Sequence, residues 1–133
     1  MKRPHHDLKV WKEAMALARK VYELTAQFPS DEKYGLTVQI RCSAVSVPSN
    51  IAEGCGRGSS KELLQFLYVA RGSLAELETQ LRLASDFGFC DSTAALVQVE
   101  SLFGLLAGLV KAQRDKTDSL QAAKRPTDKP RSG

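Results

Sequence analysis

The chain has 133 residues, of which 43% are hydrophobic and 26% charged, and 19 Lys and Arg against 15 Asp and Glu give a formal net charge of +4. These values predict one globular domain with its own core, and they exclude a second full domain and disorder throughout. The amino terminus also lacks the apolar stretch of a secretory signal, so we expect a cytoplasmic protein.

The first predicted helix covers about residues 8–28 and has an unusually wide apolar face. With residues placed at roughly 100° steps, the apolar positions occupy an arc of roughly 200°, about twice what one core needs. A narrow strip of charged residues fills the rest of the helix, and its basic members are Lys9, Lys12, Arg19 and Lys20. We therefore expect this helix to be buried from two sides and to present a basic strip to solvent.

The second predicted helix starts at Ser30, where a hydroxyl cap is followed by two acidic residues that complement the free amides of a first turn. Apolar residues at helical spacing form its buried stripe between residues 36 and 51. Pro48 lies within that stripe, and its ring and missing amide proton are expected to kink the helix. The glycine-rich segment at 54–58 then ends the helical pattern.

The third predicted helix opens with a capping box at residues 59–62 and carries a long apolar stripe with heptad spacing. The stripe consists of Leu63, Leu67, Ala70, Leu74, Leu77, Leu81 and Ala84. Gly88 followed by Phe89 fits a left-handed helix end with its apolar contact. We expect an uninterrupted helix between these two signals.

The fourth predicted helix follows Asp91, a good capping residue, and is nearly free of charge. Between residues 92 and 110 the one charged residue is Glu100. Gly104 and Gly108 are small residues four apart, which let another backbone approach closely. Polar residues dilute the segment too much for a membrane span. A helix of a small bundle without a polar face is expected to contact another subunit.

The excess positive charge lies at the end of the chain. Residues 111–133 hold seven basic and three acidic residues, whereas residues 1–110 hold 12 of each. From Gln121 onward there is no large apolar group to bury, so this stretch cannot order itself by packing. The expected parts are a mobile terminus over residues 1–7, a folded domain over residues 8–118 and a disordered basic tail over residues 119–133.

The pattern as a whole predicts an all-α protein. Four segments of helical periodicity are joined by short connections, and no segment alternates in the manner of a strand. The expected architecture is an antiparallel up-down four-helix bundle, in which the first and fourth helices offer surface to other subunits.

No residue pattern assembles a catalytic or metal site. The glycines at 54–58 lack the Lys and Ser or Thr of a phosphate loop, and a helix precedes them where a strand is required. His5 and His6 lie in the expected mobile terminus, without a nucleophile or a third ligand at helical spacing. Three cysteines without paired spacing are typical of free thiols. We expect no enzyme activity, no metal and no cofactor.

Nucleic-acid binding is the more specific possibility. The basic strip at Lys9, Lys12, Arg19 and Lys20 and the basic tail together offer enough cations for salt-sensitive phosphate contacts. A mixture of Lys and Glu is also what an ordinary solvated helix face contains, and composition by itself favours that simpler interpretation.

Several strings of the sequence resemble a known family. They are DLKVW at 7–11, YGL at 34–36, QIR at 39–41, SVPSNIAEG at 46–54, GR at 56–57 and ARGSLAELE at 70–78. Together they are similar to the four-helix bundle family first met as proteins encoded in intervening sequences of bacterial 23S ribosomal RNA genes. The resemblance implies a homopentameric ring of up-down bundles. It also implies a relationship to the accessory protein of diversity-generating retroelements, which binds nucleic acid and a reverse transcriptase.

The longest of these strings places polar residues after the expected bend. Asn50, Glu53 and Arg57 have spacings that allow one polar cluster, which Glu76 or Arg71 of the next helix would complete. Such a cluster either holds two helices together through satisfied polar groups or binds a ligand or nucleic acid. The small residues expected to permit close helix packing are Ala52, Gly54 and Gly56.

Three functions follow, in order of preference. The first is a non-enzymatic oligomeric scaffold, a pentamer by the resemblance, that binds RNA or DNA through the basic strip and the tails, with avidity raised by symmetry. The second is a protein-binding adaptor whose ring presents a groove to another polypeptide and has no affinity for nucleic acid. The third is an enzyme that uses Asn50, Glu53 and Arg57.

Overall fold

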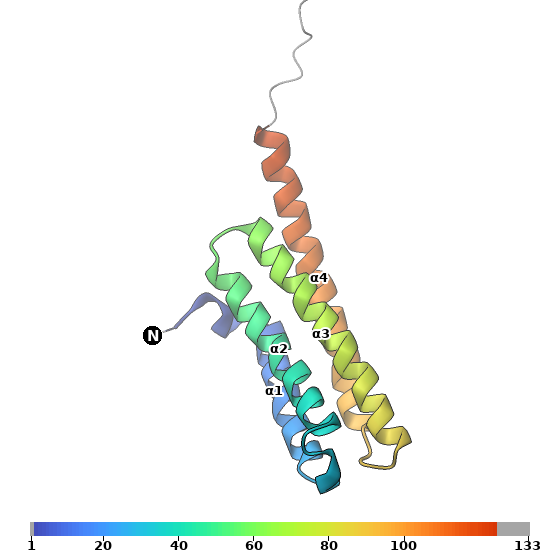
Figure 1. Ribbon diagram of the computed structural model, residues 1–133. Coiled ribbons are helices and arrows are strands. Elements are labelled where there is room, and N and C mark those ends of the chain that lie inside the picture. The colour runs from blue at the N-terminus through green and yellow to red at the C-terminus, as the bar shows by residue number, and fades with distance from the viewer. Residues whose placement is uncertain (1, 125–133) are drawn as a thin grey trace, which may run out of the picture.

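The computed structural model describes residues 2–124, which form four α-helices and two short 3-10 helices. The helices are η1 at Pro4–Asp7, α1 at Lys9–Thr25, η2 at Ser30–Glu32, α2 at Leu36–Gly56, α3 at Ser60–Asp86 and α4 at Thr93–Lys124. Within these residues there is no strand, and α1 to α4 run alternately up and down (Figure 1). The predicted all-α four-helix bundle is confirmed.

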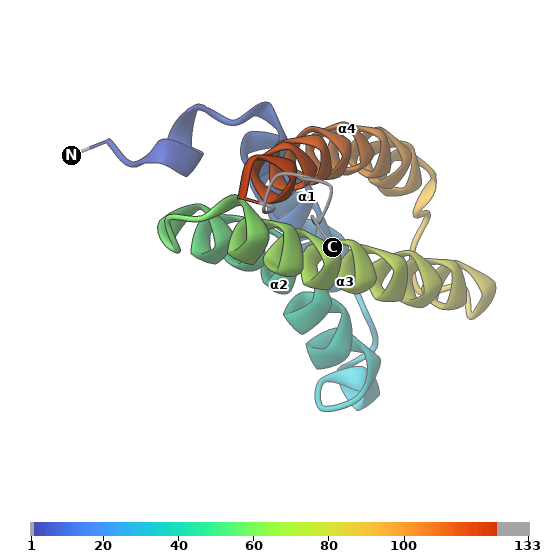
Figure 2. The same ribbon diagram turned by 90° about the horizontal axis from the view of Figure 1, so that it is seen from above.

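The four long helices form a closed arrangement. Each packs against its neighbours in the chain, and α1 also packs against α4, so α1 lies diagonally across the bundle from α3. The α1–α2 pair crosses the α3–α4 pair, and the end that carries the α1–α2 connection splays away from α3 (Figures 1 and 2). At the opposite end α4 projects beyond the other helices (Figure 1).

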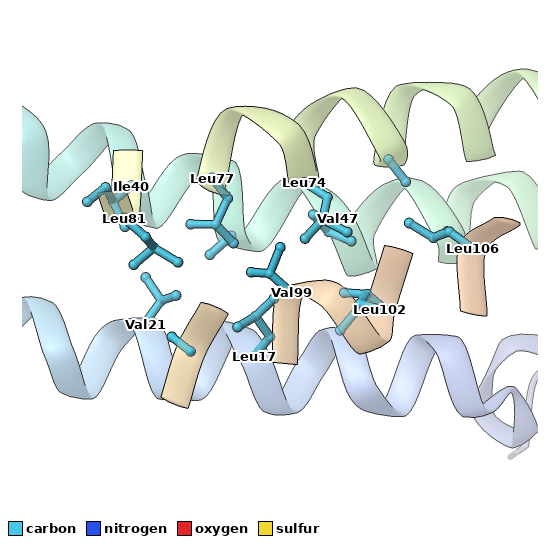
Figure 3. Packing of buried hydrophobic residues seen from close by; sticks show 14 of the residues in the cluster. Leu17, Val21, Ile40, Val47, Leu74, Leu77, Leu81, Val99, Leu102 and Leu106 are labelled. Carbon is cyan, nitrogen blue, oxygen red and sulfur yellow. The ribbon is translucent and has the colours of Figure 1, made fainter. Parts of the chain in front are cut away.

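The predicted stripes meet in one apolar core. In α3 every stripe residue from Leu67 to Ala84 is fully buried, whereas Leu63 at the helix start is partly buried. Burial of each large side chain stabilises the fold by roughly 1.5–3 kcal/mol. Around these residues pack Leu17 and Val21 of α1, Ile40 and Val47 of α2, and Val99, Leu102 and Leu106 of α4 (Figure 3).

The predicted helix ends are largely confirmed. Ser59 is the cap of α3, and its Oγ atom accepts a hydrogen bond from the Glu62 amide at 3.1 Å. Gly88, after α3, has a φ of 78°, the left-handed conformation that glycine adopts without steric cost. Asp91 Oδ1 accepts hydrogen bonds from the Thr93 amide at 3.0 Å and the Thr93 hydroxyl at 2.7 Å, at the start of α4.

The predicted start of the second helix is wrong. Ser30 does not begin α2, because Ser30–Glu32 forms the separate 3-10 helix η2 and α2 begins at Leu36. Gly35, a poor helix former, interrupts the pattern just before Leu36. The Leu36 amide donates to Glu32 Oε1 at 3.3 Å. Glu32, which was expected in the first turn of the helix, therefore lies before α2 and caps its first amide. Pro48 lies within α2, which continues through it to Gly56.

The two ends of the described chain also differ from the expected boundaries. Residues 4–7, which were assigned to a mobile terminus, form η1, and the His5 ring lies 4.9 Å from the Trp11 ring, centroid to centroid. The expected tail began at residue 119, whereas α4 continues to Lys124 because good helix formers follow that point. Residues 125–133, the rest of the expected basic tail, lie outside the described residues.

Candidate functional site

The predicted basic strip lies on the outer side of α1. Lys9, Lys12 and Arg19 are exposed, and Lys20 is partly buried. The core residues of α1 point the other way, which turns these side chains toward solvent. Within residues 2–124 none of the four forms an ion pair with a carboxylate. Their positive charges are therefore available to an anion outside the chain.

An apolar groove of about 640 Å³ runs between the outer sides of α1 and α2. One wall is Trp11, Met15, Ala18 and Tyr22 of α1, the other is Val45, Pro48, Ser49 and Ala52 of α2, and His5, Arg19 and Glu23 also line it. These α1 residues account for the excess width of the apolar arc predicted from the sequence. One part of that arc faces the bundle core, and the other part faces this groove, which is open in the single chain.

A second hollow of about 470 Å³ continues the groove and shares Tyr22 and Val45 with it. Arg41 also lines this hollow, and its guanidinium carbon lies 4.4 Å from the centre of the Tyr22 ring. The Arg41 Nε atom donates to Thr25 Oγ1 at 2.7 Å. A cation stacked on a ring and hydrogen-bonded to a buried hydroxyl is held in place. Arg41 therefore gives this end of the groove a fixed polar edge.

The string at 46–54 divides between the groove and the core. Pro48, Ile51 and Gly54 are all buried, and of these Pro48 lines the groove. A Cβ atom at Gly54 would lie 2.9 Å from Leu63 Cδ1 of α3, so the expectation of close packing is confirmed there. It is wrong for Gly56, where a Cβ atom would meet nothing within 4 Å. The reason is that Gly56 is the exposed last residue of α2.

Asn50 links α2 to α3 through two serines. Its Nδ2 atom donates to the Ser46 carbonyl at 2.8 Å and to Ser46 Oγ at 3.0 Å. Ser46 Oγ in turn lies 2.8 Å from Ser73 Oγ of α3, in hydrogen-bond contact. These partly buried groups satisfy one another, which is a structural role in holding the two helices together.

The single polar cluster expected from the spacing is not formed. Glu53 Oε2 accepts from Arg57 Nη2 at 2.8 Å in an exposed pair one turn apart. Asn50 bonds to Ser46, one turn before it, whereas Glu53 bonds to Arg57, one turn after it. No hydrogen bond in the described chain therefore joins Asn50 to Glu53. Glu76 is exposed and lines a separate hollow of about 350 Å³ near Ser73. The residues of the proposed enzyme site are therefore divided between two contacts.

Arg71 belongs to a different arrangement, on the edge between α3 and α4. Its guanidinium carbon lies 4.8 Å from the centre of the Tyr68 ring. Arg114 of α4 donates from Nη2 to the Tyr68 hydroxyl at 2.7 Å, and this hydrogen bond raises the pKa of Arg114. Sequence reasoning missed this group. The spacing of three between Tyr68 and Arg71 was visible, but Arg114 lies 46 residues away from Tyr68 and follows no local pattern.

The outer face of α4 is apolar and open. A Cβ atom at Gly104 or at Gly108 would meet nothing within 4 Å, and Val97 on the same helix is 66% exposed. By length and composition alone, α4 is long and apolar enough to cross a membrane, so the expectation that its polar residues dilute it too far is wrong. The same composition suits a helix that packs against another protein surface.

The chemistry-bearing side chains do not gather elsewhere in the described residues. Between residues 2 and 124 no group of three or more His, Cys, Asp or Glu side chains is placed to hold a metal ion. His6 Nδ1 accepts a hydrogen bond from the Arg3 amide at 3.0 Å. Burial raises the pKa of the Cys55 and Cys90 thiols, so both are held in the less reactive thiol form.

A comparison with models of protein families places these residues in a known family. The model of a protein family described as 23S rRNA-intervening sequence protein matches residues 6–107. The matched region includes the basic strip of α1, both helical walls of the apolar groove, and the Asn50 and Glu53 contacts, and it ends within α4. No curated protein matches the chain.

Proposed function

We propose that this chain, which belongs to the 23S rRNA-intervening sequence protein family, is a non-enzymatic, cytoplasmic and oligomeric protein that binds RNA or DNA. The observation that carries the proposal is the α1 strip of Lys9, Lys12, Arg19 and Lys20. These cations share one helix face and form no ion pair within residues 2–124. Such a face attracts a phosphate backbone through counterion release, without a need for base recognition.

A head-to-tail ring is the proposed assembly. Two apolar surfaces on different helices support it: the groove between α1 and α2, and the open face of α4 around Gly104 and Gly108. Contact between two unlike surfaces repeats from subunit to subunit and closes into a ring when the rotation allows. The number of five subunits rests on the family resemblance alone. Light scattering is expected to give a multiple of the 14.6 kDa chain mass, and a monomer at micromolar concentration would refute the ring.

The ring would multiply a weak contact. One α1 strip offers four cations and also carries Glu13 and Glu23, so a single copy is expected to bind weakly. Linking several copies turns later contacts into intramolecular ones and raises avidity without new interactions. Binding is therefore expected to fall steeply when the oligomer is diluted below its dissociation constant.

A salt titration of RNA and DNA binding tests the nucleic-acid proposal. The full chain is compared with a chain that ends at Lys124, so that α4 is kept and residues 125–133 are removed. Both are expected to bind at low salt, with affinity falling linearly in the logarithm of salt concentration. No binding by either chain at low salt would refute the proposal. Loss of binding in the shorter chain alone would show that residues 125–133, and not the α1 strip, attract the nucleic acid.

The second candidate is a protein-binding adaptor. It is favoured by the groove of about 640 Å³, whose apolar walls fit the face of an amphipathic helix from another polypeptide. The two candidates differ in their response to salt, because apolar docking is far less sensitive to screening than phosphate binding. Peptide binding that is lost in Val45→Glu, with no RNA affinity at low salt, would favour the adaptor.

A further inference from the structure

Tyr68, on the edge between α3 and α4, contacts two arginines, Arg71 and Arg114. Arg71 stacks on the Tyr68 ring at 4.8 Å from its centre, and Arg114 donates to the Tyr68 hydroxyl at 2.7 Å. Tyr68 itself is partly buried and packs against the core. The ring therefore serves as a fixed support for two guanidinium groups that come from different helices.

Neither arginine is neutralised by direct pairing. Arg71 and Arg114 are exposed, and neither lies within ion-pair distance of a carboxylate in the described part of the chain. Asp115 and Asp118 are the acids closest in sequence to Arg114. Asp115 is already engaged by Lys111 at 3.2 Å. Three cations, Arg71, Lys111 and Arg114, are thus set against two acids, Asp115 and Asp118.

The geometry leaves most donors free. A guanidinium has five N–H groups in a planar fork, and the fork matches phosphate oxygens. Arg114 uses one Nη2 donor on Tyr68, and Arg71 uses its flat face on the ring, so the remaining N–H groups of both form no hydrogen bond within residues 2–124. Because Tyr68 already restricts the Arg71 and Arg114 side chains, these side chains lose less conformational entropy when a phosphate binds.

We propose that Tyr68, Arg71 and Arg114 form a phosphate-binding subsite for the backbone of single-stranded nucleic acid. The subsite rests on the proposed function. Tyr68 and Arg71 lie on α3, diagonally across the bundle from the α1 strip, and Arg114 lies on α4. Arg114 also leaves α4 about 120° around the helix axis from Gly108, so it lies beside the face proposed for subunit contact and outside its centre.

The test measures binding of a fluorescent single-stranded oligouridine by the full chain across a salt series. Two variants probe the subsite: Arg71→Gln with Arg114→Gln removes the charges, and Tyr68→Phe removes only the hydroxyl. The matched controls are Arg82→Gln, whose arginine pairs with Glu78 at 3.3 Å, and Tyr34→Phe, an exposed tyrosine. All the substituted side chains are at least partly exposed, and circular dichroism and light scattering verify the fold and the assembly.

The double arginine variant is expected to lower the slope of log affinity against log salt by about 1.4, since each phosphate contact on a single strand contributes about 0.7. Tyr68→Phe keeps the net charge but removes the hydrogen bond that positions Arg114. It is expected to weaken binding by about 2- to 10-fold, which corresponds to one hydrogen bond. The two controls are expected to bind like the parent, apart from a small general charge effect of Arg82→Gln. Parent-like slope and affinity in both subsite variants would overturn this inference alone, whereas no binding by the parent would overturn the proposed function itself.

Discussion

A Cβ atom on Gly54 of α2 would lie 2.8 Å from the Cβ atom of Phe66 on α3, closer than real Cβ atoms approach. We therefore expect Gly54→Ala to lower the free energy of unfolding by about 1–2 kcal/mol. Displacing α3 side chains costs more than the roughly 1 kcal/mol that alanine gains over glycine in a helix interior. Urea unfolding at fixed protein concentration measures the change.

The control is Gly72→Ala in α3, where a Cβ atom would meet nothing within 4 Å. This substitution is expected to raise the free energy of unfolding by about 0.5–1 kcal/mol. If Gly54→Ala is as stable as Gly72→Ala, the two helices do not touch as closely as described.

Leu77 lies at the centre of the apolar core, with no exposed surface (Figure 3). Leu77→Ala removes buried methyl groups and leaves a cavity, so the free energy of unfolding is expected to fall by about 2–5 kcal/mol. Leu120→Ala, at a leucine that is 51% exposed, is expected to change it by less than about 0.5 kcal/mol. Equal effects of the two substitutions in urea would contradict the predicted core.

Asp91 gives the fold a contribution that depends on pH. Hydrogen bonds from the Thr93 hydroxyl and amide lower the pKa of the Asp91 carboxyl below its ordinary value of 3.8. A lowered pKa means that the stabilisation is present above the pKa of the unfolded chain and is lost as pH falls through the folded-state pKa. We expect Asp91→Ala to have a lower Tm than the parent at pH 7 and a matching Tm in acid.

Thr93→Val tests the cause of this effect. It removes the hydroxyl donor and keeps the backbone donor to Asp91, so the difference in Tm across pH is expected to be smaller than in the parent but not absent. A parent and an Asp91→Ala variant that differ equally at every pH would show that the carboxylate charge is not responsible.

Gly108 reports on the proposed ring. A side chain there meets no atom within the subunit, so Gly108→Leu is expected to leave the helical content intact. In the ring the same side chain would separate the open face of α4 from the next subunit, and we expect a shift toward the 14.6 kDa monomer in light scattering. Gly72→Leu on α3 is the matched control, expected to keep the parent mass. An unchanged mass in Gly108→Leu would show that this face of α4 does not form the contact between subunits.

The four helices could be predicted because each carries a repeating apolar pattern that the core then uses. The heptad stripe from Leu67 to Ala84 is buried along its whole length, and the Ser59 and Gly88 signals mark the ends of α3. The start of α2 was missed because Ser30 and the acids after it fit a helix cap equally well in a 3-10 turn. The start of α2 at Leu36 depends on Gly35 and on the hydrogen bond from the Leu36 amide to the Glu32 carboxylate, a contact that no spacing rule predicts.

The candidate site was less predictable, because it depends on contacts between distant segments. The α1 strip follows from periodicity alone, and so does the wide apolar arc that lines the groove with Trp11 and Tyr22. The partners of Asn50 could not be predicted, because Ser46 and Ser73 belong to no periodic pattern that would indicate a hydrogen bond between helices. The support of Arg114 by Tyr68 joins two helices through the fold and is absent from any local pattern.

A charge-matched pair of variants tests whether the unpaired lysines of α1 bind nucleic acid. One variant carries Lys9→Gln, Lys12→Gln and Lys20→Gln, and leaves Arg19 in place because it lines the groove. The control removes the same net charge with Lys33→Gln, Lys61→Gln and Arg82→Gln, three exposed positions outside α1 of which one, Arg82, forms an ion pair.

The slope of log affinity against log salt for single-stranded RNA is the measurement. The α1 variant is expected to lose about 2 from this slope, at about 0.7 for each phosphate contact, and the control is expected to lose much less. Equal slopes in the two variants would refute binding by the α1 strip, because they would show that net charge, and not the face of α1, governs binding.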